Sequence, residues 1–124
     1  MTRRTHTLTL SWILLLCLAT LVACTAPVDE GKTLELGREV YVNQCSHCHQ
    51  EEGQGYAQVF PHLAGNPIVL LEDPAPVIEI VLHGRGSMPG YKDSLSGEDR
   101  ARVISYIRNS WGNHASYVAT SQAQ

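Results

Sequence analysis

The stretch NQCSHCHQ, residues 43–50, contains two of the chain's four cysteines and two of its six histidines. Thiol and imidazole groups bind transition metals, and two cysteines three residues apart can instead form a redox disulfide. The motif Cys-x-x-Cys-His is also the attachment sequence of a c-type haem. These residues therefore permit three kinds of site, and the rest of the chain has to distinguish among them.

The spacing of Cys45, Cys48 and His49 favours haem attachment. On one helical turn the two cysteines face the same side, so both sulfurs can bond to one porphyrin while His49 is brought to the iron. A structural zinc ion needs four protein ligands, and beyond His47 the chain offers no second cysteine pair once its export segment is removed. A thioredoxin-like disulfide site is expected beside a βαβ pattern, which the sequence lacks.

Residues 1–23 have the pattern of an export signal, in which Arg3 and Arg4 precede an apolar stretch and the sequence LVAC at 21–24. The apolar stretch is shorter than the roughly 20 residues that span a bilayer, which argues against a transmembrane helix. LVAC resembles the lipobox of bacterial lipoproteins. That resemblance implies cleavage before Cys24 and lipid on its thiol, with enough acyl chains for stable membrane anchoring. A secreted protein that merely has a cysteine near its cleavage site is the alternative.

The balance of charge excludes one class of partner. The chain has 12 acidic and 9 basic residues, for a formal net charge of −3 at pH 7, and removal of Arg3 and Arg4 makes the remainder more acidic. Because nucleic-acid binding depends on basic side chains that neutralise phosphates, nucleic acid is not an expected partner.

The rest of the sequence predicts a tether at 24–32, one domain at 33–112 and a flexible C-terminal tail at 113–124. An apolar face predicts a helix at 33–44, which leads into the cysteine cluster. Asp73 can cap a second helix that ends at Gly84. Its continuous apolar run would also suit a strand, but the cap and the terminal glycine together favour a helix. Ser96 and Asp99 resemble a capping box for a third helix, ending near Gly112. The intervening loops are long for so small a domain and are expected to wrap around something.

Two residues far from the cluster support a haem site. Met88 is the only methionine after the initiator, and it lies in the glycine- and proline-rich stretch 84–93. A thioether presented by such a loop can bind iron opposite His49. The other nitrogen of His49 needs a hydrogen-bond acceptor, and Pro61 keeps its carbonyl although it has no N–H to donate.

The residues quoted so far resemble a class I, single-haem c-type cytochrome of bacterial type. The resemblance extends from Gly37 to Asn113, through GREVYVNQCSHCHQEEGQG, FPHLAGNP and GSMPGYKDSLSGEDRARVISYIRNSWGN. It implies an all-α cytochrome c fold, in which three to four short helices and long loops wrap around one covalently bound haem. The first and last helices would cross, with Gly37 and Tyr41 against Val103 and Tyr106.

The same resemblance implies the site residues. Haem c would be bound through thioethers to Cys45 and Cys48, with His49 and Met88 as the axial ligands of its iron. The carbonyl of Pro61 would accept the ring hydrogen of His49, and Leu63 would line the haem pocket.

Other residues could play a part in the site. His62 or His83 could replace Met88 as the sixth ligand, although each is more often a surface histidine. Arg85 and Trp111 could contact a haem propionate, although an exposed arginine and a packed tryptophan are the more usual outcome.

The function expected from the resemblance is electron transfer without catalysis by the chain itself. The protein would be lipid-anchored on the periplasmic side of a bacterial membrane and exchange electrons with a redox protein donor and acceptor. It would be a monomer, or a stably bound subunit of a membrane dehydrogenase, nitrite reductase or terminal oxidase. A haem-based ligand sensor or peroxidase is the alternative from another class.

Overall fold

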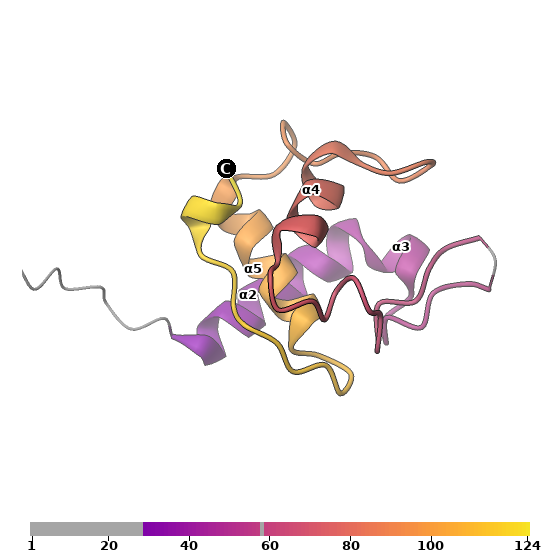
Figure 1. The fold of residues 1–124 in the computed structure, drawn as a ribbon, viewed down its shortest axis with the longest axis horizontal. Coiled ribbons are helices and arrows are strands. Elements are labelled where there is room, and N and C mark those ends of the chain that lie inside the picture. The colour runs from indigo at the N-terminus through magenta and orange to yellow at the C-terminus, as the bar shows by residue number, and fades with distance from the viewer. Residues whose placement is uncertain (1–28, 58) are drawn as a thin grey trace, which may run out of the picture.

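The computed structural model describes residues 29–57 and 59–124 (Figure 1). Its elements are the helices α2 (Glu30–Gln44), α3 (Ser46–His49), α4 (Ala75–His83) and α5 (Gly97–Arg108) and the 3-10 helix η1 (Thr120–Gln122). This part of the chain contains no β-strand, and none of its helices is long and apolar enough to cross a bilayer. The predicted all-α fold is confirmed. The predicted signal at 1–23 and Cys24 lie outside the described residues.

Helix α2 begins three residues before the predicted start at Thr33. The side chain of Asp29 accepts a hydrogen bond from the backbone N–H of Lys32, 3.0 Å away, and so satisfies one of the free donors of the first turn. Residues 30–32, predicted to belong to a tether, are therefore helical. The sequence prediction started from the apolar face and overlooked this cap.

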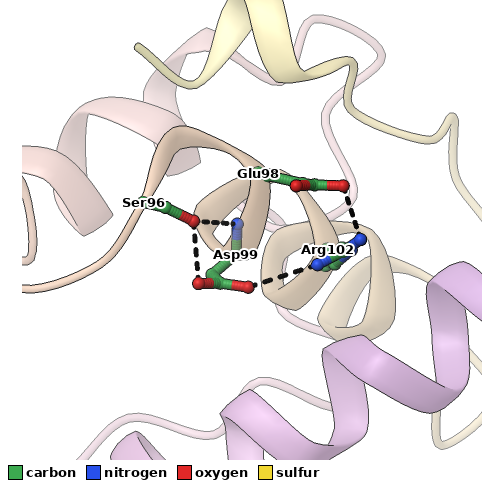
Figure 2. Close-up of polar contacts among 4 residues, drawn as sticks. All are labelled: Ser96, Glu98, Asp99 and Arg102. Atoms are coloured by element: carbon green, nitrogen blue, oxygen red, sulfur yellow. Dashed lines mark hydrogen bonds and ion pairs between the residues drawn. The ribbon is translucent and has the colours of Figure 1, made fainter.

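Helix α5 begins with the predicted cap (Figure 2). The hydroxyl of Ser96 accepts a hydrogen bond from the backbone N–H of Asp99 at 3.0 Å and donates one to the Asp99 carboxylate at 2.7 Å. Arg102 lies one turn further on and pairs with Glu98 at 2.5 Å and with Asp99 at 3.4 Å. These carboxylates also lie at the positive end of the helix dipole, so the first turn is stabilised by both effects.

Helix α4 confirms the choice of helix over strand for residues 75–83. The carboxylate of Asp73 accepts a hydrogen bond from the backbone N–H of Ala75 at 3.0 Å. The helix ends at Gly84, whose φ of 77° lies in the left-handed region that glycine adopts without strain. Because both ends are determined by local chemistry, the helix was predictable from sequence.

Helices α2 and α5 cross in close contact, as Figure 1 shows. Gly37 makes the approach possible, since a Cβ atom there would overlap the carbonyl oxygen of Arg102 and lie 2.8 Å from the Cβ of Tyr106. The contact expected between Gly37 and Tyr106 is therefore present. Val103, 1 % exposed, belongs to the same core.

Three aromatic rings extend the crossing toward the end of α2. Tyr41 lies with its ring centroid 5.5 Å from that of Tyr106 and 4.9 Å from that of Trp111. The buried Tyr41 hydroxyl donates a hydrogen bond to the backbone carbonyl of Gln50, 2.5 Å away. Gln50 follows α3 directly and has a φ of 64°, so this bond helps to hold the turn after the cysteine cluster.

The C-terminal segment differs from the predicted flexible tail, because it packs along α5 (Figure 1). Val118 and Ala123 are buried in the core. The backbone N–H of Val118 donates to the hydroxyl of Ser105 at 2.9 Å, and the buried Arg100 donates to the carbonyl of Ala123 at 2.8 Å. These polar side chains on α5 satisfy the backbone of the tail, which gave no periodic pattern in the sequence.

The end of α5 also differs from the prediction. The helix stops at Arg108, four residues before Gly112, and Trp111 and Gly112 then adopt left-handed φ values of 55° and 84°. Arg108 is fully buried and donates to the carbonyl oxygens of Val69 and Ser116 at 2.6 and 2.9 Å. One arginine thus joins the end of α5 to the loop before α4 and to the C-terminal segment.

We expect Gly37→Ala to lower the free energy of unfolding by about 1–3 kcal/mol, because the added methyl group must push α2 away from the backbone of α5. Gly31→Ala in the same helix is the control, since its Cβ would meet only a carboxylate oxygen of Asp29 at 3.6 Å. Urea denaturation of the haem-loaded protein measures both. Equal stability of the two variants would contradict the proposed role of Gly37.

We expect Tyr41→Phe to destabilise the protein by about 1–2 kcal/mol, because the carbonyl of Gln50 loses its partner. Burial raises the pKa of the Tyr41 phenol well above its ordinary value of 10.0. The unfolded chain therefore releases this proton near pH 10 while the folded chain keeps it, so the stability from Tyr41 is present below pH 10 and is lost above it.

The same pH dependence should be weaker in Tyr41→Phe. Tyr56→Phe is the control, since Tyr56 is 65 % exposed. Urea denaturation at pH 7 and at pH 11 measures the difference, and an identical loss of stability at high pH in wild type and Tyr41→Phe would count against the buried phenol.

Candidate functional site

The cysteine cluster lies where α2 passes into the single turn of α3. Cys45 ends α2, and its carbonyl accepts hydrogen bonds from the backbone N–H groups of Cys48 and His49 at 3.2 and 3.0 Å. The two cysteines therefore lie at the start and on the third residue of one helical turn, as their spacing predicts. Cys45 is half-buried, Cys48 is exposed and His49 is buried, whereas His47 is exposed.

Cys45 does not have the properties of a redox cysteine. The thiols of Cys45 and Cys48 are both free in the structure. Burial raises the pKa of the Cys45 thiol to about 12, with a smaller contribution from Cys48. Reactive redox cysteines have a lowered pKa, because the thiolate is the reactive form. Among the described residues, no group of three or more His, Cys, Asp and Glu side chains is placed to hold a metal ion.

The ring of His49 is oriented by the residue expected to orient it. Its Nδ1 lies 2.8 Å from the carbonyl oxygen of Pro61. Because a carbonyl can only accept, Nδ1 carries the proton and Nε2 keeps its lone pair. A histidine in this tautomer has one nitrogen available to a metal, and its basicity is raised by the bond at the other.

The loop after α3 turns back so that Pro61 reaches His49. The backbone N–H of Gly55 donates to the carbonyl of His49 at 2.9 Å, and Tyr56 and Phe60 exchange two backbone hydrogen bonds of 2.9 Å. Gly55 has a φ of 66°, and a Cβ atom there would lie 2.5 Å from the carbonyl oxygen of Phe60 and 2.7 Å from the carbonyl carbon of Pro61. A glycine is therefore needed at 55 for the Pro61 carbonyl to come this close.

Asn113 holds the next part of the same loop. Its side chain is 2 % exposed; the amide nitrogen donates to the carbonyl of Leu63 at 3.1 Å, and the amide oxygen accepts from the N–H of Gly65 at 2.8 Å. A further bond of 2.8 Å to the carbonyl of Ile107 ties this contact to α5. Leu63, expected to line the pocket, is half-buried and packs against the core.

Met88 lies in a tight turn between α4 and α5. Arg85 and Met88 exchange two backbone hydrogen bonds of 3.1 Å, and the Met88 side chain is half-buried against the core. The turn is tied to the cysteine segment, because the hydroxyl of Tyr91 donates to the carbonyl of Gln44, 3.0 Å away and next to Cys45. The structure thus brings the methionine loop and the cluster to one side of the molecule.

Among the described residues, the remaining candidates make no side-chain hydrogen bond to His49 or Met88. Trp111 packs on Tyr41, and a Cβ atom at Gly53 would lie 2.5 Å from its ring, so the tryptophan is a packed residue. Arg85 and His62 are exposed. His83 is also exposed and lies 3.5 Å from a carboxylate oxygen of Glu79.

Sequence reasoning missed Asn113 and gave no role to Tyr91. Asn113 falls in the segment predicted to be a tail, and its partners in the loop precede it by 48 and 50 residues. Tyr91 is separated from Gln44 by 47 residues. No local pattern signals such contacts, because each depends on two segments that only the folded chain brings together.

The donor set fits a c-type haem. Two thiols on one helical turn suit thioether attachment, and Nε2 of His49 and the thioether of Met88 are neutral donors of the kinds that hold haem iron. The half-buried Cys45, Leu63 and Met88 supply apolar surface for a porphyrin.

Comparison with known proteins identifies the family. The family model described as cytochrome c oxidase, cbb3-type, subunit III matches residues 32–107. The chain is 40% identical over 96 residues to the cytochrome c subunit of alcohol dehydrogenase (quinone) from Gluconacetobacter polyoxogenes, over 68% of this chain and 20% of the relative. It is 32% identical over 106 residues to the gluconate 2-dehydrogenase cytochrome c subunit of Pantoea cypripedii, over 75% and 24%.

A smaller relative is matched over more of its length. Cytochrome c-552 of Thermus thermophilus is 30% identical over 92 residues, which cover 62% of this chain and 69% of the relative. By contrast, the chain spans about a fifth of the alcohol dehydrogenase subunit.

The match includes the Cys-x-x-Cys-His motif, and the arrangement described above places a histidine, an acceptor for its ring and a methionine loop around that motif. The chain therefore belongs to the cytochrome c family of the cbb3-type oxidase subunit III, and it is an electron-carrier domain with haem c bound covalently through Cys45 and Cys48.

Proposed function

We propose that this domain carries single electrons with His49 and Met88 as the axial ligands of its haem iron, and that it is not an enzyme by itself. The observation that carries the proposal is the hydrogen bond between Tyr91 and Gln44, since it ties the loop of Met88 to the segment that bears the haem cysteines. Haem c supplies an iron that accepts and returns one electron.

His49 is suited to be one ligand. Its Nδ1 donates to Pro61, so that Nε2 is the nitrogen with a free lone pair and the ring cannot rotate without losing this bond. The ring is 8 % exposed, which keeps water from competing for the hydrogen bond.

Met88 is suited to be the other ligand. A thioether is a soft, neutral donor, and a histidine and methionine pair favours the reduced state of the iron and raises its potential. With both axial positions filled by protein, no coordination position is left open to a substrate. The expected role is therefore electron transfer, and a ligand sensor or peroxidase is the less favoured alternative.

A dehydrogenase complex is the candidate partner with which this domain exchanges electrons. Two of the relatives are named as cytochrome c subunits of an alcohol dehydrogenase (quinone) and of a gluconate 2-dehydrogenase. The chain spans only part of the length of those subunits. From their names we propose that it transfers electrons to or from a membrane dehydrogenase, either as a bound subunit or as a separate carrier.

The proposed location is the periplasmic side of a bacterial membrane, with lipid on Cys24. The supporting feature is the sequence LVAC at 21–24, which follows a basic start and an apolar stretch. The first described helix begins at Glu30, so a lipid on Cys24 would be joined to the folded domain by a few residues.

We expect Met88→Leu to lower the reduction potential markedly and to let the reduced protein bind carbon monoxide at neutral pH, which the wild type should resist. His62→Gln and His83→Gln are controls that remove the alternative sixth ligands. Optical titration and voltammetry measure these effects. A spectrum that changes in either histidine variant but not in Met88→Leu would contradict the proposed ligand.

If the protein is a subunit, haem staining after affinity purification from native membranes should find it in an assembly much larger than 13.6 kDa, together with a dehydrogenase. Recovery of the chain alone, under detergent conditions that preserve membrane complexes, would favour a separate carrier.

We expect Cys24→Ser to move most of the protein from the membrane fraction to the soluble fraction, because no acyl chain can then be attached. Cys17→Ser is the matched control, since Cys17 lies in the stretch expected to be removed with the signal. Membrane retention of Cys24→Ser in a cell fractionation would oppose lipid anchoring.

A further inference from the structure

We infer that Tyr91 is a positioning residue, whose hydroxyl fastens the Met88 loop to the haem-bearing segment and thereby slows the opening of the iron to other ligands. The inference rests on the proposed ligation by His49 and Met88. It goes beyond that ligation because it assigns the stability of the Met88 bond to a residue that does not touch the iron.

The loop itself is short and internally closed. It leaves α4 at Gly84, where a Cβ atom would overlap the carbonyl oxygen of Met88, and Met88 pairs with Arg85 through two backbone hydrogen bonds of 3.1 Å. A Cβ atom at Gly90 would lie 2.6 Å from the carbonyl oxygen of Leu82. The loop therefore folds back on the end of α4.

Tyr91 lies where this loop joins the rest of the domain. Its backbone N–H donates to the carbonyl of Val81 at 2.8 Å, and its own carbonyl accepts from the side chain of Arg100 at 3.4 Å. Its hydroxyl donates to the carbonyl of Gln44 at 3.0 Å. One residue, three positions after Met88, thus touches α4, α5 and the end of α2.

The contact with Gln44 has no substitute. Among the hydrogen bonds of residues 29–57 and 59–124, it is the one that links 84–93 to the segment 43–50. Burial raises the pKa of the Tyr91 phenol, which agrees with a partly buried hydroxyl beside the carbonyl of Gln44.

The physical consequence concerns opening of the loop. For a small ligand to replace Met88, the thioether must move away from the iron, and the loop must move with it. The bond from Tyr91 to Gln44 opposes that movement, because it joins the loop to the haem-bearing segment. The backbone bonds of Tyr91 to Val81 and Arg100 do not involve the hydroxyl, so they are retained when the hydroxyl is removed. Loss of the hydroxyl alone should therefore favour the open state by about fivefold, the factor expected for one hydrogen bond.

The test is the rate at which imidazole replaces the sixth ligand of the oxidised, haem-loaded protein. Tyr91→Phe keeps the ring and removes the hydroxyl, and we expect imidazole to bind about fivefold faster with the His49 side of the site unchanged. Val118→Ala is the control for general loss of stability, since Val118 is buried in the C-terminal segment and belongs neither to the Met88 loop nor to the haem-bearing segment. It should leave the imidazole rate unchanged.

The outcomes separate the inference from the proposed function. Met88→Leu should bind imidazole without a slow opening step. If it does and Tyr91→Phe behaves as wild type, the role of Tyr91 is refuted and the ligation stands. If Val118→Ala accelerates binding as much as Tyr91→Phe, the effect is one of general stability and the inference fails. If Met88→Leu binds imidazole as the wild type does, both the ligation and the inference are wrong.

Discussion

The close crossing of α2 and α5 at Gly37 is the constraint on which the rest of the structure depends. Because there is no side chain between the two backbones, Tyr41 can pack between Tyr106 and Trp111 one turn later. The crossing thereby sets the direction of α2, and with it the position of Cys45 and of the turn of α3 that follows. A haem attached to that turn takes its position relative to the domain from a contact made two turns earlier in the helix.

Two loops contribute the other residues of the site, and polar side chains fix the positions of these loops. The carbonyl of Pro61 reaches His49 because Gly55 allows a close approach and because Asn113 fastens the following residues to α5. In the second loop, the hydroxyl of Tyr91 joins the Met88 loop to the end of α2. One loop thus meets the haem-bearing segment at the ring of His49, and the other meets it at the backbone carbonyl of Gln44.

Local chemistry was predictable from the sequence, and contacts between distant segments were not. The caps at Asp73 and Ser96 identified two helices, since a cap and its partners lie within three residues. Pro61 was predictable because the histidine of a haem site needs an acceptor. The packed tail was not, because Ser105 and the two buried arginines of α5 stabilise a segment that has no pattern of its own.

The central claim is that the iron lies between an imidazole nitrogen of His49 and the thioether sulfur of Met88. X-ray absorption at the iron edge of the purified, haem-loaded protein tests it most directly, because sulfur and nitrogen scatter differently. The account predicts one sulfur and five nitrogen ligands, four of them from the porphyrin, and loss of the sulfur in Met88→Leu. Six nitrogen ligands in the wild type, or an empty sixth position, would contradict it.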